Sequence, residues 1–263
     1  RRRRTAVSGR VAVVTGANRG IGRAIAGALA ADGFATAVTA RDPATLADTV
    51  SGIEQRGGTV AAFACDVRDE VSVAALADAV LARWGTVHTV VANAGVAGPT
   101  APLHEIGLPE WRDCLATDLD GVFLTFRAFI PALVQAGEGS LVAISSMTGK
   151  RPLHGRTPYA AAKMGVLGLV RTLALELGPL GIRVNAVCPG AVAGPRIDDV
   201  IRRQASARGI SEAEALTAFT AASPLGRLVE ADEVGRTCPF LASDAASAIT
   251  GDAPHVPAAV VTP

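Results

Sequence analysis

The one tyrosine of this chain lies four residues before a lysine, in the segment Tyr159-Ala-Ala-Ala-Lys163. Residues i and i+4 of a helix share a face, so the Lys163 ammonium is expected near the Tyr159 phenol. A neighbouring cation favours the phenolate form, and such a group can exchange a proton with an alcohol or carbonyl oxygen near neutral pH. The spacing by itself also fits an ordinary pair on a helix surface.

Ser146 is the next candidate because it directly follows a strand-like run at residues 141–145. Its hydroxyl would bind the same substrate oxygen as Tyr159, although a serine at a strand end is also a common cap or turn residue. Two arginines, Arg151 and Arg156, lie in the loop between Ser146 and Tyr159. They are expected either to attract an anionic substrate or carrier, or to be solvated loop residues.

A glycine turn near the N-terminus has the form of a phosphate site. Residues 11–15 are a Val-rich run, and Gly16, Gly20 and Gly22 follow it in a Gly-x-x-x-Gly-x-Gly pattern. Glycine permits a tight turn and a close backbone approach, and the following helix N-terminus offers free N–H groups to a pyrophosphate. The turn predicts a dinucleotide site, with a plain strand-to-helix turn as the alternative.

Polar residues also follow two later strand-like runs. Asp66 follows the run at residues 60–65, where its carboxylate can accept a hydrogen bond from an adenine amino group, and Asn93-Ala94-Gly95 follow the next run. Open α/β sheets bind ligands at the carboxyl ends of their strands, so these residues and the glycine turn are expected at one edge of a sheet. A tight turn would account for Gly95 alone but not for the whole set.

The end of the second strand-like run distinguishes the two nicotinamide dinucleotides. A carboxylate there would bind the ribose 2′-hydroxyl of NAD(H) and repel a 2′-phosphate. Here the run ends at Ala40 and Arg41 follows, while Arg19 lies in the glycine turn. Because two guanidinium groups favour a phosphate, NADP(H) is expected. The nearby Asp42 favours the alternative, NAD(H).

Short apolar runs alternate with longer helical segments and would position these residues. Strands are expected at residues 11–15, 35–40, 60–65, 87–92, 141–145 and 182–187. Helices are expected at residues 21–31, 44–56, 71–84 and 159–177. Nearly all-apolar strands that alternate with helices indicate an α/β fold, with a parallel sheet covered on both faces and right-handed crossovers.

We expect one domain over residues 9–263, preceded by a flexible basic tail at residues 1–8. A long polar segment at residues 191–223 is predicted to be a lid over the substrate pocket. The proline-rich segment from residue 251 is expected to contribute at most an edge strand.

Composition and charge argue against several classes of protein. Hydrophobic residues make up 49% of the chain and the formal net charge is +1, which predicts a folded core without a general attraction to nucleic acid or an anionic membrane. We expect no membrane span, because no apolar run approaches the ~20 residues it needs, and no signal peptide after the basic start. The Arg1–Arg4 run supports only a non-specific, salt-dependent contact with nucleic acid.

The four cysteines, Cys65, Cys114, Cys188 and Cys238, are far apart in the sequence. They form no Cys-x-x-Cys pair, and no histidine lies at metal-ligand spacing from them. They are typical of reduced, buried thiols in a cytoplasmic protein, and no metal site is expected.

Together these motifs resemble the short-chain dehydrogenase/reductase family in its single-domain form, and most closely its bacterial 3-oxoacyl-carrier-protein reductase-like members. The resemblance covers residues from about 9 to 251. It rests on Thr-Gly-Ala-Asn-Arg-Gly-Ile-Gly at 15–22, Asp66, Asn-Ala-Gly at 93–95, the interval from Ser146 to Tyr159, the Tyr-x-x-x-Lys segment and Pro189-Gly190.

The resemblance implies a Rossmann-type, doubly wound, mostly parallel sheet of about seven strands, and a homodimer or homotetramer. It also implies hydride transfer between NADP(H) and a small-molecule carbonyl or secondary alcohol. Tyr159 would be the general acid or base, Lys163 would assist it and bind the nicotinamide ribose, and Ser146 would steady the substrate oxygen. The implied cofactor-binding residues are Gly16, Asn18, Arg19, Gly20, Ile21, Gly22, Arg41, Asp66, Val67, Asn93, Ala94, Gly95, Tyr159, Lys163, Pro189, Gly190 and Val192.

Three positions depart from the family pattern. Asp118 stands where the fourth catalytic residue is usually asparagine. A carboxylate there can still serve a proton relay, but it cannot donate as an amide does, and its charge disfavours a neighbouring phenolate. Gly194 replaces a threonine that in many relatives meets the nicotinamide amide, and the C-terminal segment lacks the usual glycine-rich strand.

These departures leave a second hypothesis, a catalytically weak member that binds the cofactor as a regulatory or scaffold protein. The complete Ser146, Tyr159 and Lys163 set argues against it. A nucleotide-sugar epimerase or dehydratase is disfavoured, because its different glycine spacing and its longer substrate-binding C-terminal part are both missing.

Overall fold

Short Val-rich segments form a parallel sheet in the computed structural model, which describes residues 9–221, 223 and 225–256. The strands are β1 (Val11–Val14), β2 (Ala35–Ala40), β3 (Val60–Ala64), β4 (Thr89–Ala92), β5 (Gly139–Ile144), β6 (Ile182–Pro189) and β7 (His255–Val256). Their order is β3-β2-β1-β4-β5-β6-β7, and every neighbouring pair is parallel. The predicted α/β fold with about seven parallel strands is confirmed.

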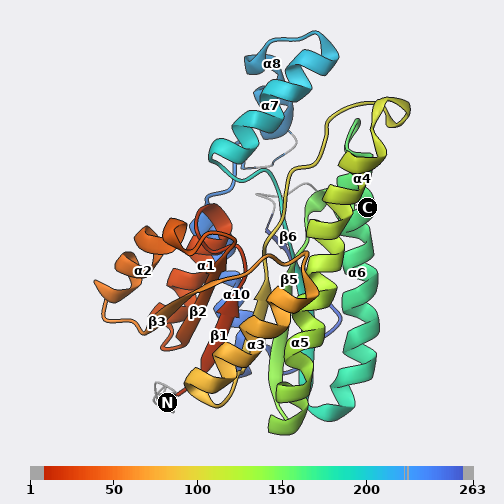
Figure 1. The fold of residues 1–263 in the computed structure, drawn as a ribbon. Coiled ribbons are helices and arrows are strands. Elements are labelled where there is room, and N and C mark those ends of the chain that lie inside the picture. The colour runs from red at the N-terminus through yellow and green to blue at the C-terminus, as the bar shows by residue number, and fades with distance from the viewer. Residues whose placement is uncertain (1–8, 222, 224, 257–263) are drawn as a thin grey trace.

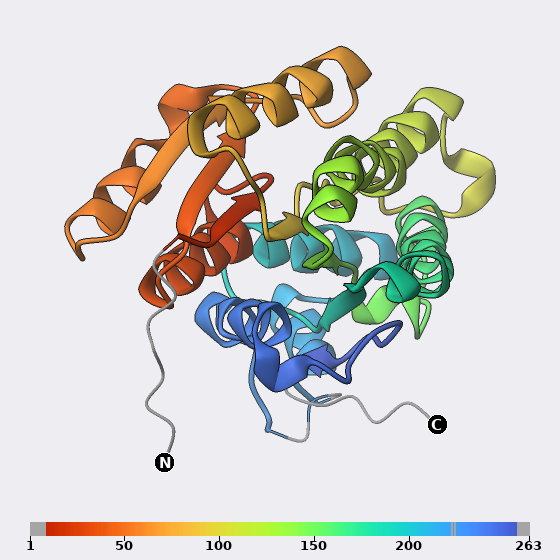
Figure 2. The same cartoon turned by 90° about the horizontal axis from the view of Figure 1, so that it is seen from below.

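Helices cover both faces of the sheet. They are α1 (Gly20–Ala31), α2 (Ala47–Glu54), α3 (Glu70–Trp84), α4 (Leu108–Leu115), α5 (Gly121–Ala136), α6 (Thr157–Leu177), α7 (Pro195–Arg208), α8 (Glu212–Ala221), α9 (Ala231–Gly235) and α10 (Thr237–Ala242). Helices α3, α5 and α6 form an apolar cluster with one face of the sheet, and α1, α2, α9 and α10 form the cluster on the other face (Figure 2). Strands β1 and β4 are buried along their whole length because they lie between these two clusters.

The strand order reverses beside β1, which lies between β2 and β4. The chain leaves β1 toward α1 on one face of the sheet and leaves β4 toward the helices of the other face, so the two following loops diverge. Such a reversal is where open α/β sheets hold ligands. The glycine turn after β1 and the Asn93–Gly95 segment after β4 therefore meet at one edge of the sheet.

The segment that contains Asp118 forms a long helix that the sequence analysis did not predict. Helix α4, a π-helical turn at Ala116–Asp120 and α5 run continuously over Leu108–Ala136. By length and composition alone this helix could cross a membrane, a property that the search for uninterrupted apolar runs did not indicate. Charged residues such as Asp120 and Arg127 interrupt the apolar run, whereas Phe126 and other apolar residues of α5 are buried against the sheet.

Two helix starts differ from their predicted positions, and proline explains both. The predicted helix at 44–56 begins as a separate 3₁₀ turn at Pro43–Leu46, which the Asp42 side chain caps, and continues as α2. Helix α6 begins at Thr157, two residues earlier than predicted, with Pro158 in its first turn. Proline is tolerated there because the first N–H groups of a helix have no partner within the helix.

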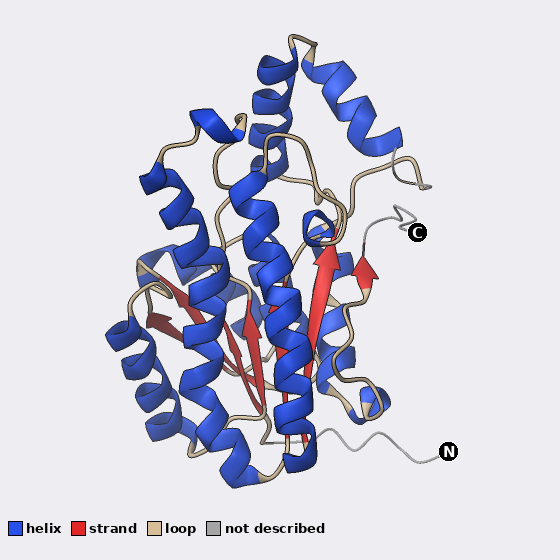
Figure 3. Cartoon of the chain, turned by 90° about the vertical axis from the view of Figure 1, so that its right-hand side faces the viewer, coloured by secondary structure: helices blue, strands red, loops and turns tan. Residues whose placement is uncertain are grey.

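Helices α7 and α8 project above the carboxyl edge of the sheet (Figures 1 and 3). They pack on each other through a small apolar cluster of their own, which includes Ile201, Ala205 and Ala215. This is the segment predicted to be a lid. At the far edge, β7 is the expected short edge strand, while residues 1–8 and 257–263, for which a tail was predicted, lie outside the described residues.

Candidate active site

A cleft of about 1160 Å³ lies at the carboxyl edge of the sheet, between the strand ends and helices α7 and α8. Residues from the loops after six strands, β1 to β6, line it. With the exception of Asp118, every residue predicted for catalysis or cofactor binding is among its lining residues. The sequence motifs are therefore brought together in one place, although their roles remain predictions.

The glycine turn is shaped by close backbone approach. Gly16 has φ +64°, and a Cβ there would lie 2.8 Å from the Cα of Ala94. A Cβ at Gly22 would lie 2.2 Å from the carbonyl oxygen of Gly16. Helix α1 begins here without a side-chain cap and without an acidic residue in its first turn. Its N-terminal N–H groups are thus available to an anion.

Asn93 holds the glycine turn from the neighbouring strand. Its side-chain amide donates to the carbonyl oxygens of Thr15 at 2.8 Å and Gly16 at 3.0 Å. The Thr15 hydroxyl accepts in return from the N–H groups of Asn93 and Ala94. The amide of Asn93 therefore supports the turn, a contribution that its predicted role in cofactor binding did not include.

Two arginines stand beside the glycine turn, as predicted. Arg19 and Arg41 both line the cleft, and neither forms an ion pair within residues 9–221, 223 and 225–256. Asp42, the residue that favoured NAD(H), accepts from the N–H of Ala44 at 2.9 Å. Its carboxylate is thus engaged by the turn that follows β2.

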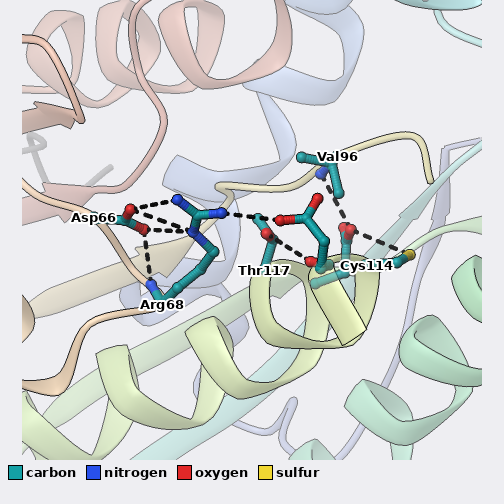
Figure 4. Close-up of polar contacts among 7 residues, drawn as sticks. Asp66, Arg68, Val96, Cys114 and Thr117 are labelled. Carbon is teal, nitrogen blue, oxygen red and sulfur yellow. Dashed lines mark hydrogen bonds and ion pairs between the residues drawn. The ribbon is translucent and has the colours of Figure 1, made fainter. Parts of the chain in front are cut away.

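A third arginine, Arg68, reaches the same part of the cleft (Figure 4). Its guanidinium donates to both carboxylate oxygens of Asp66, and Nη1 donates to Asp113 at 2.9 Å. This guanidinium holds the pKa of the Asp66 carboxyl below its usual value. Asp66 is therefore an ionised acceptor that already has a partner. The sequence analysis proposed Asp66 as an adenine contact and did not foresee Arg68.

Helix α6 presents Tyr159 and Lys163 to the cleft from one face. The Lys163 ammonium lies 5.6 Å from the centroid of the Tyr159 ring and donates to the carbonyl oxygen of Ile144 at 3.1 Å. Ser145 donates from its hydroxyl to the Lys163 carbonyl at 2.9 Å, which fixes the end of β5 against the helix. Ser146 follows in the cleft wall, with its hydroxyl oxygen accepting from the Thr148 N–H.

Asp118 is behind the cleft wall and forms an ion pair with Lys163. Its Oδ1 lies 2.9 Å from the lysine Nζ, and the two side chains are 0% and 4% exposed. Its Oδ2 accepts from the backbone N–H of Val96 at 3.1 Å (Figure 4). Gly95 leaves the space for this pair, because a Cβ there would lie 2.5 Å from Oδ1. The sequence predicted an effect of Asp118 on the Tyr159 phenol. It did not predict that the ion-pair partner of Asp118 is Lys163.

For Arg156, the predicted alternative of a solvated loop residue is wrong, because its side chain is buried in the cleft wall. The guanidinium carbon lies 4.9 Å from the centroid of the Tyr159 ring, and Nη2 donates to the carbonyl oxygen of Ala97. The sequence signal for the contact between Arg156 and Tyr159 was their spacing of three residues. This spacing indicates a contact only where the helix begins before Tyr159, and the helix was predicted to begin at Tyr159.

The far wall of the cleft comes from the segment after β6. Pro189 is the last residue of β6 and Gly190 follows it, and Val192 pairs with Val229 in an isolated parallel bridge. Gly194 has φ +129°, a conformation that favours glycine over the threonine of many relatives. Apolar side chains of α7 and α8 complete this side of the cleft, among them Ile197, Val200 and Phe219.

Comparisons with known proteins agree with this geometry. A family model described as enoyl-(acyl carrier protein) reductase matches residues 16–258. The chain is 41% identical to a protein of Streptomyces violaceoruber named as a ketoacyl reductase of granaticin polyketide synthase, over 94% of this chain and 91% of that protein. It is also 41% identical to a cis-4-hydroxycyclohexanecarboxylate dehydrogenase of Sinomonas cyclohexanicum, with 92% of each chain covered.

A solved structure has the same fold. The crystal structure of a variant of an actinorhodin polyketide ketoreductase with NADPH superimposes with a TM-score of 0.91. The sequence identity is 36%, and the superposition covers 97% of both chains. The similarity therefore extends over the sheet, the cleft and the helices above it.

Proposed function

The chain belongs to the short-chain dehydrogenase/reductase family of oxidoreductases, and from this premise we propose the reaction that it catalyses. The enzyme transfers hydride between NADP(H) and the carbon of a ketone or secondary alcohol, with Tyr159 as general acid or base. A ketone or a secondary alcohol is the shared chemistry of the named activities of its relatives. The observation that carries the proposal is one cleft that holds both the Tyr159–Lys163 face of α6 and the uncapped N-terminus of α1.

The residues present fit a phosphorylated dinucleotide. The pyrophosphate would accept from the free N–H groups at the start of α1, where glycines at positions 16, 20 and 22 leave room for it. Arg19 and Arg41 would bind the 2′-phosphate, because both are without an ion pair in the described chain and Asp42 caps its own turn. Asp66 would accept from the adenine amino group beside Arg68.

The reaction would combine the cofactor with three side chains of this chain. When bound, the nicotinamide supplies or accepts the hydride. Tyr159 donates its phenol proton to the substrate oxygen in reduction and takes a proton in oxidation. Ser146 donates a hydrogen bond to the same oxygen, and the Lys163 ammonium, held by Asp118 and the Ile144 carbonyl, stabilises the phenolate that remains.

The direct test is NADPH oxidation by wild-type protein and by Tyr159→Phe across a panel of ketones. We expect turnover by the wild type, a loss of at least ~100-fold in kcat/KM in the variant, and nearly unchanged NADPH affinity, because the phenol proton is lost and the ring is kept. A matched control is Thr157→Val, a change two residues earlier on an exposed position of the same helix. Undiminished turnover by Tyr159→Phe would refute the assigned role.

A further inference from the structure

Arg156 is a buried cation whose hydrogen-bonding capacity is mostly unused. Arg156 is 4% exposed, and its Nε and Nη1 atoms have no hydrogen-bond partner among the described residues. Only Nη2 is engaged, with the Ala97 carbonyl. Nε carries one N–H and Nη1 carries two, so three of the five guanidinium N–H groups lack an acceptor.

Among the described residues, no ion pair includes Arg156. Asp118 acts on it electrostatically, but this carboxylate is already paired with Lys163. Arg196 of α7, which also acts on it, is a second cation. Burial lowers the pKa of the guanidinium from its usual value, but arginine remains protonated at neutral pH. A buried cation left in this state is strongly destabilising.

The cleft is the place from which a bound group can approach Arg156. Arg156 is one of the residues that line the cleft, and its guanidinium lies against the ring of Tyr159. A group bound there would be next to the phenol that acts on the substrate oxygen. The cofactor phosphates are expected at the opposite end, at the start of α1. The group at Arg156 would therefore belong to the substrate.

We propose that Arg156 determines substrate specificity by binding a carboxylate of the substrate, so that the enzyme acts on small oxo acids or hydroxy acids. This inference rests on the proposed function, since it names the substrate class of the same cleft. A single carboxylate matches a single buried guanidinium and would supply charge-assisted hydrogen bonds to it once a small shift of the side chain turns Nε or Nη1, each with less than 1 Å² of accessible surface here, toward the cleft. Leu153, Ile197 and Phe219 line the cleft as well and would contact the hydrocarbon part of such a substrate.

The proposal is tested with pairs of ketones that differ only in charge. Wild-type enzyme with NADPH is assayed on 4-oxocyclohexanecarboxylate and on its neutral carboxamide. We expect kcat/KM to be about 10- to 100-fold higher for the carboxylate, the range of charge-assisted hydrogen bonds. Arg156→Met, which keeps an unbranched apolar side chain against Tyr159, should remove this preference mainly through KM, so that the ratio of kcat/KM for the carboxylate to that for the carboxamide falls toward one.

Two further variants make the result specific. Arg151→Met removes an exposed arginine of the same loop and should retain the preference for the carboxylate. Arg156→Lys retains the positive charge and should keep part of the preference; if Arg156→Met does not fold, this variant and the wild-type comparison decide. Equal rates on the two ketones in the wild type would overturn the inference, while turnover of both would leave the proposed function standing.

A binding measurement separates the two proposals when no ketone is reduced. Cyclohexanecarboxylate, which has no ketone, is titrated calorimetrically into wild-type protein and into Arg156→Lys, with cyclohexanecarboxamide as the neutral control. Binding of the carboxylate alone, weakened in the variant, would support the anion site even if the proposed reaction failed. Absence of binding together with absence of turnover would overturn both.

Discussion

The ring of Tyr159 has two cations beside it, and the two are in different electrostatic states. Lys163 is neutralised by Asp118 at 2.9 Å, whereas Arg156 is buried without a carboxylate partner. The sequence indicated the Tyr159–Lys163 pair through its i, i+4 spacing. It could not indicate the Asp118–Lys163 pair, because 45 residues separate the two positions and only the contact between α4–α5 and α6 brings them together.

The Asp118–Lys163 pair should be required for stability. We expect Asp118→Ala to lower the free energy of unfolding by about 3–5 kcal/mol, because it leaves a buried ammonium without a counter-ion. Asp118→Asn should cost less, since an amide oxygen can still accept from the Val96 N–H. Urea unfolding of both variants measures the difference. A loss below about 1 kcal/mol in Asp118→Ala would mean that the pair is not the reason for an aspartate here.

Arg41 should set the preference between the two dinucleotides. Arg41→Ala is expected to weaken NADPH binding by about 10- to 100-fold and NADH binding by less than about 3-fold, because only NADPH carries the 2′-phosphate. Calorimetric Kd values for both cofactors give the two ratios. Arg83→Ala, on α3 and outside the cleft, is the matched control and should change neither. Equal losses for NADPH and NADH would contradict the assignment.

At the scale of elements, the glycine turn and the start of α1 were predicted from the sequence, and the helices around Asp118 were not. The glycine pattern is local, and close approach to Gly16 and Asn93 explains it directly. The helix over Leu108–Ala136 has charged residues on its exposed side and a π-helical turn in its middle, so its helical periodicity is broken. Helices α9 and α10 are short and were missed because five or six residues show almost no periodicity.

Two glycines of α1 should respond to alanine in opposite directions. Gly22→Ala would place a Cβ 2.2 Å from the Gly16 carbonyl oxygen and 2.4 Å from the Asn93 amide nitrogen, so it should destabilise the turn and weaken NADPH binding. Gly27→Ala, in the same helix, meets only the end of an arginine side chain at 3.7 Å and should stabilise by about 0.5–1 kcal/mol. Thermal unfolding compares them. A neutral Gly22→Ala would contradict the close approach that the structure gives.

For the whole molecule, the alternation of strands and helices was sufficient to predict the parallel sheet, and the polar residues that follow the strands predicted its ligand edge. The segment predicted to be a lid is different: α7 and α8 were recognised only as a polar segment, because they bury a small cluster of their own rather than a face on the sheet. For Arg156 the sequence left two alternatives open, a contact with an anionic group and a solvated loop position, and it gave no sign that the side chain is buried. A loop assignment hides burial, and burial is what makes this arginine chemically significant.

The packed fold should make all four cysteines unreactive. They are free and buried, and burial raises the pKa of Cys65 to about 11 and those of Cys114 and Cys238 to about 12; the pKa of Cys188 is raised for the same reason. A thiol reagent should therefore modify none rapidly in native protein and all four after unfolding in urea. Rapid modification of one thiol in the native state would show that its part of the core opens.

The same pKa values predict how stability depends on pH. In the unfolded chain the thiols ionise near their reference pKa of 9.0, whereas in the folded protein they ionise only at a higher pH. The contribution of the buried, protonated thiols to the free energy of unfolding is fully present below pH 9.0. It is lost as the pH rises from there toward about 11 to 12. Urea unfolding across this pH window should show a decreasing free energy of unfolding. Replacing Cys238 by alanine should make the decrease with pH less steep. Increasing stability over the window would be the wrong sign.

The most direct test of the central claim is a fluorescence titration of purified protein with NADPH and with NADH, since it requires no choice of substrate. We expect saturable binding of one dinucleotide per chain, with NADPH bound at least ~10-fold more tightly because of Arg19 and Arg41. Tighter binding of NADH would contradict the assignment of the 2′-phosphate site. Failure to bind either cofactor would contradict the proposed oxidoreductase activity itself.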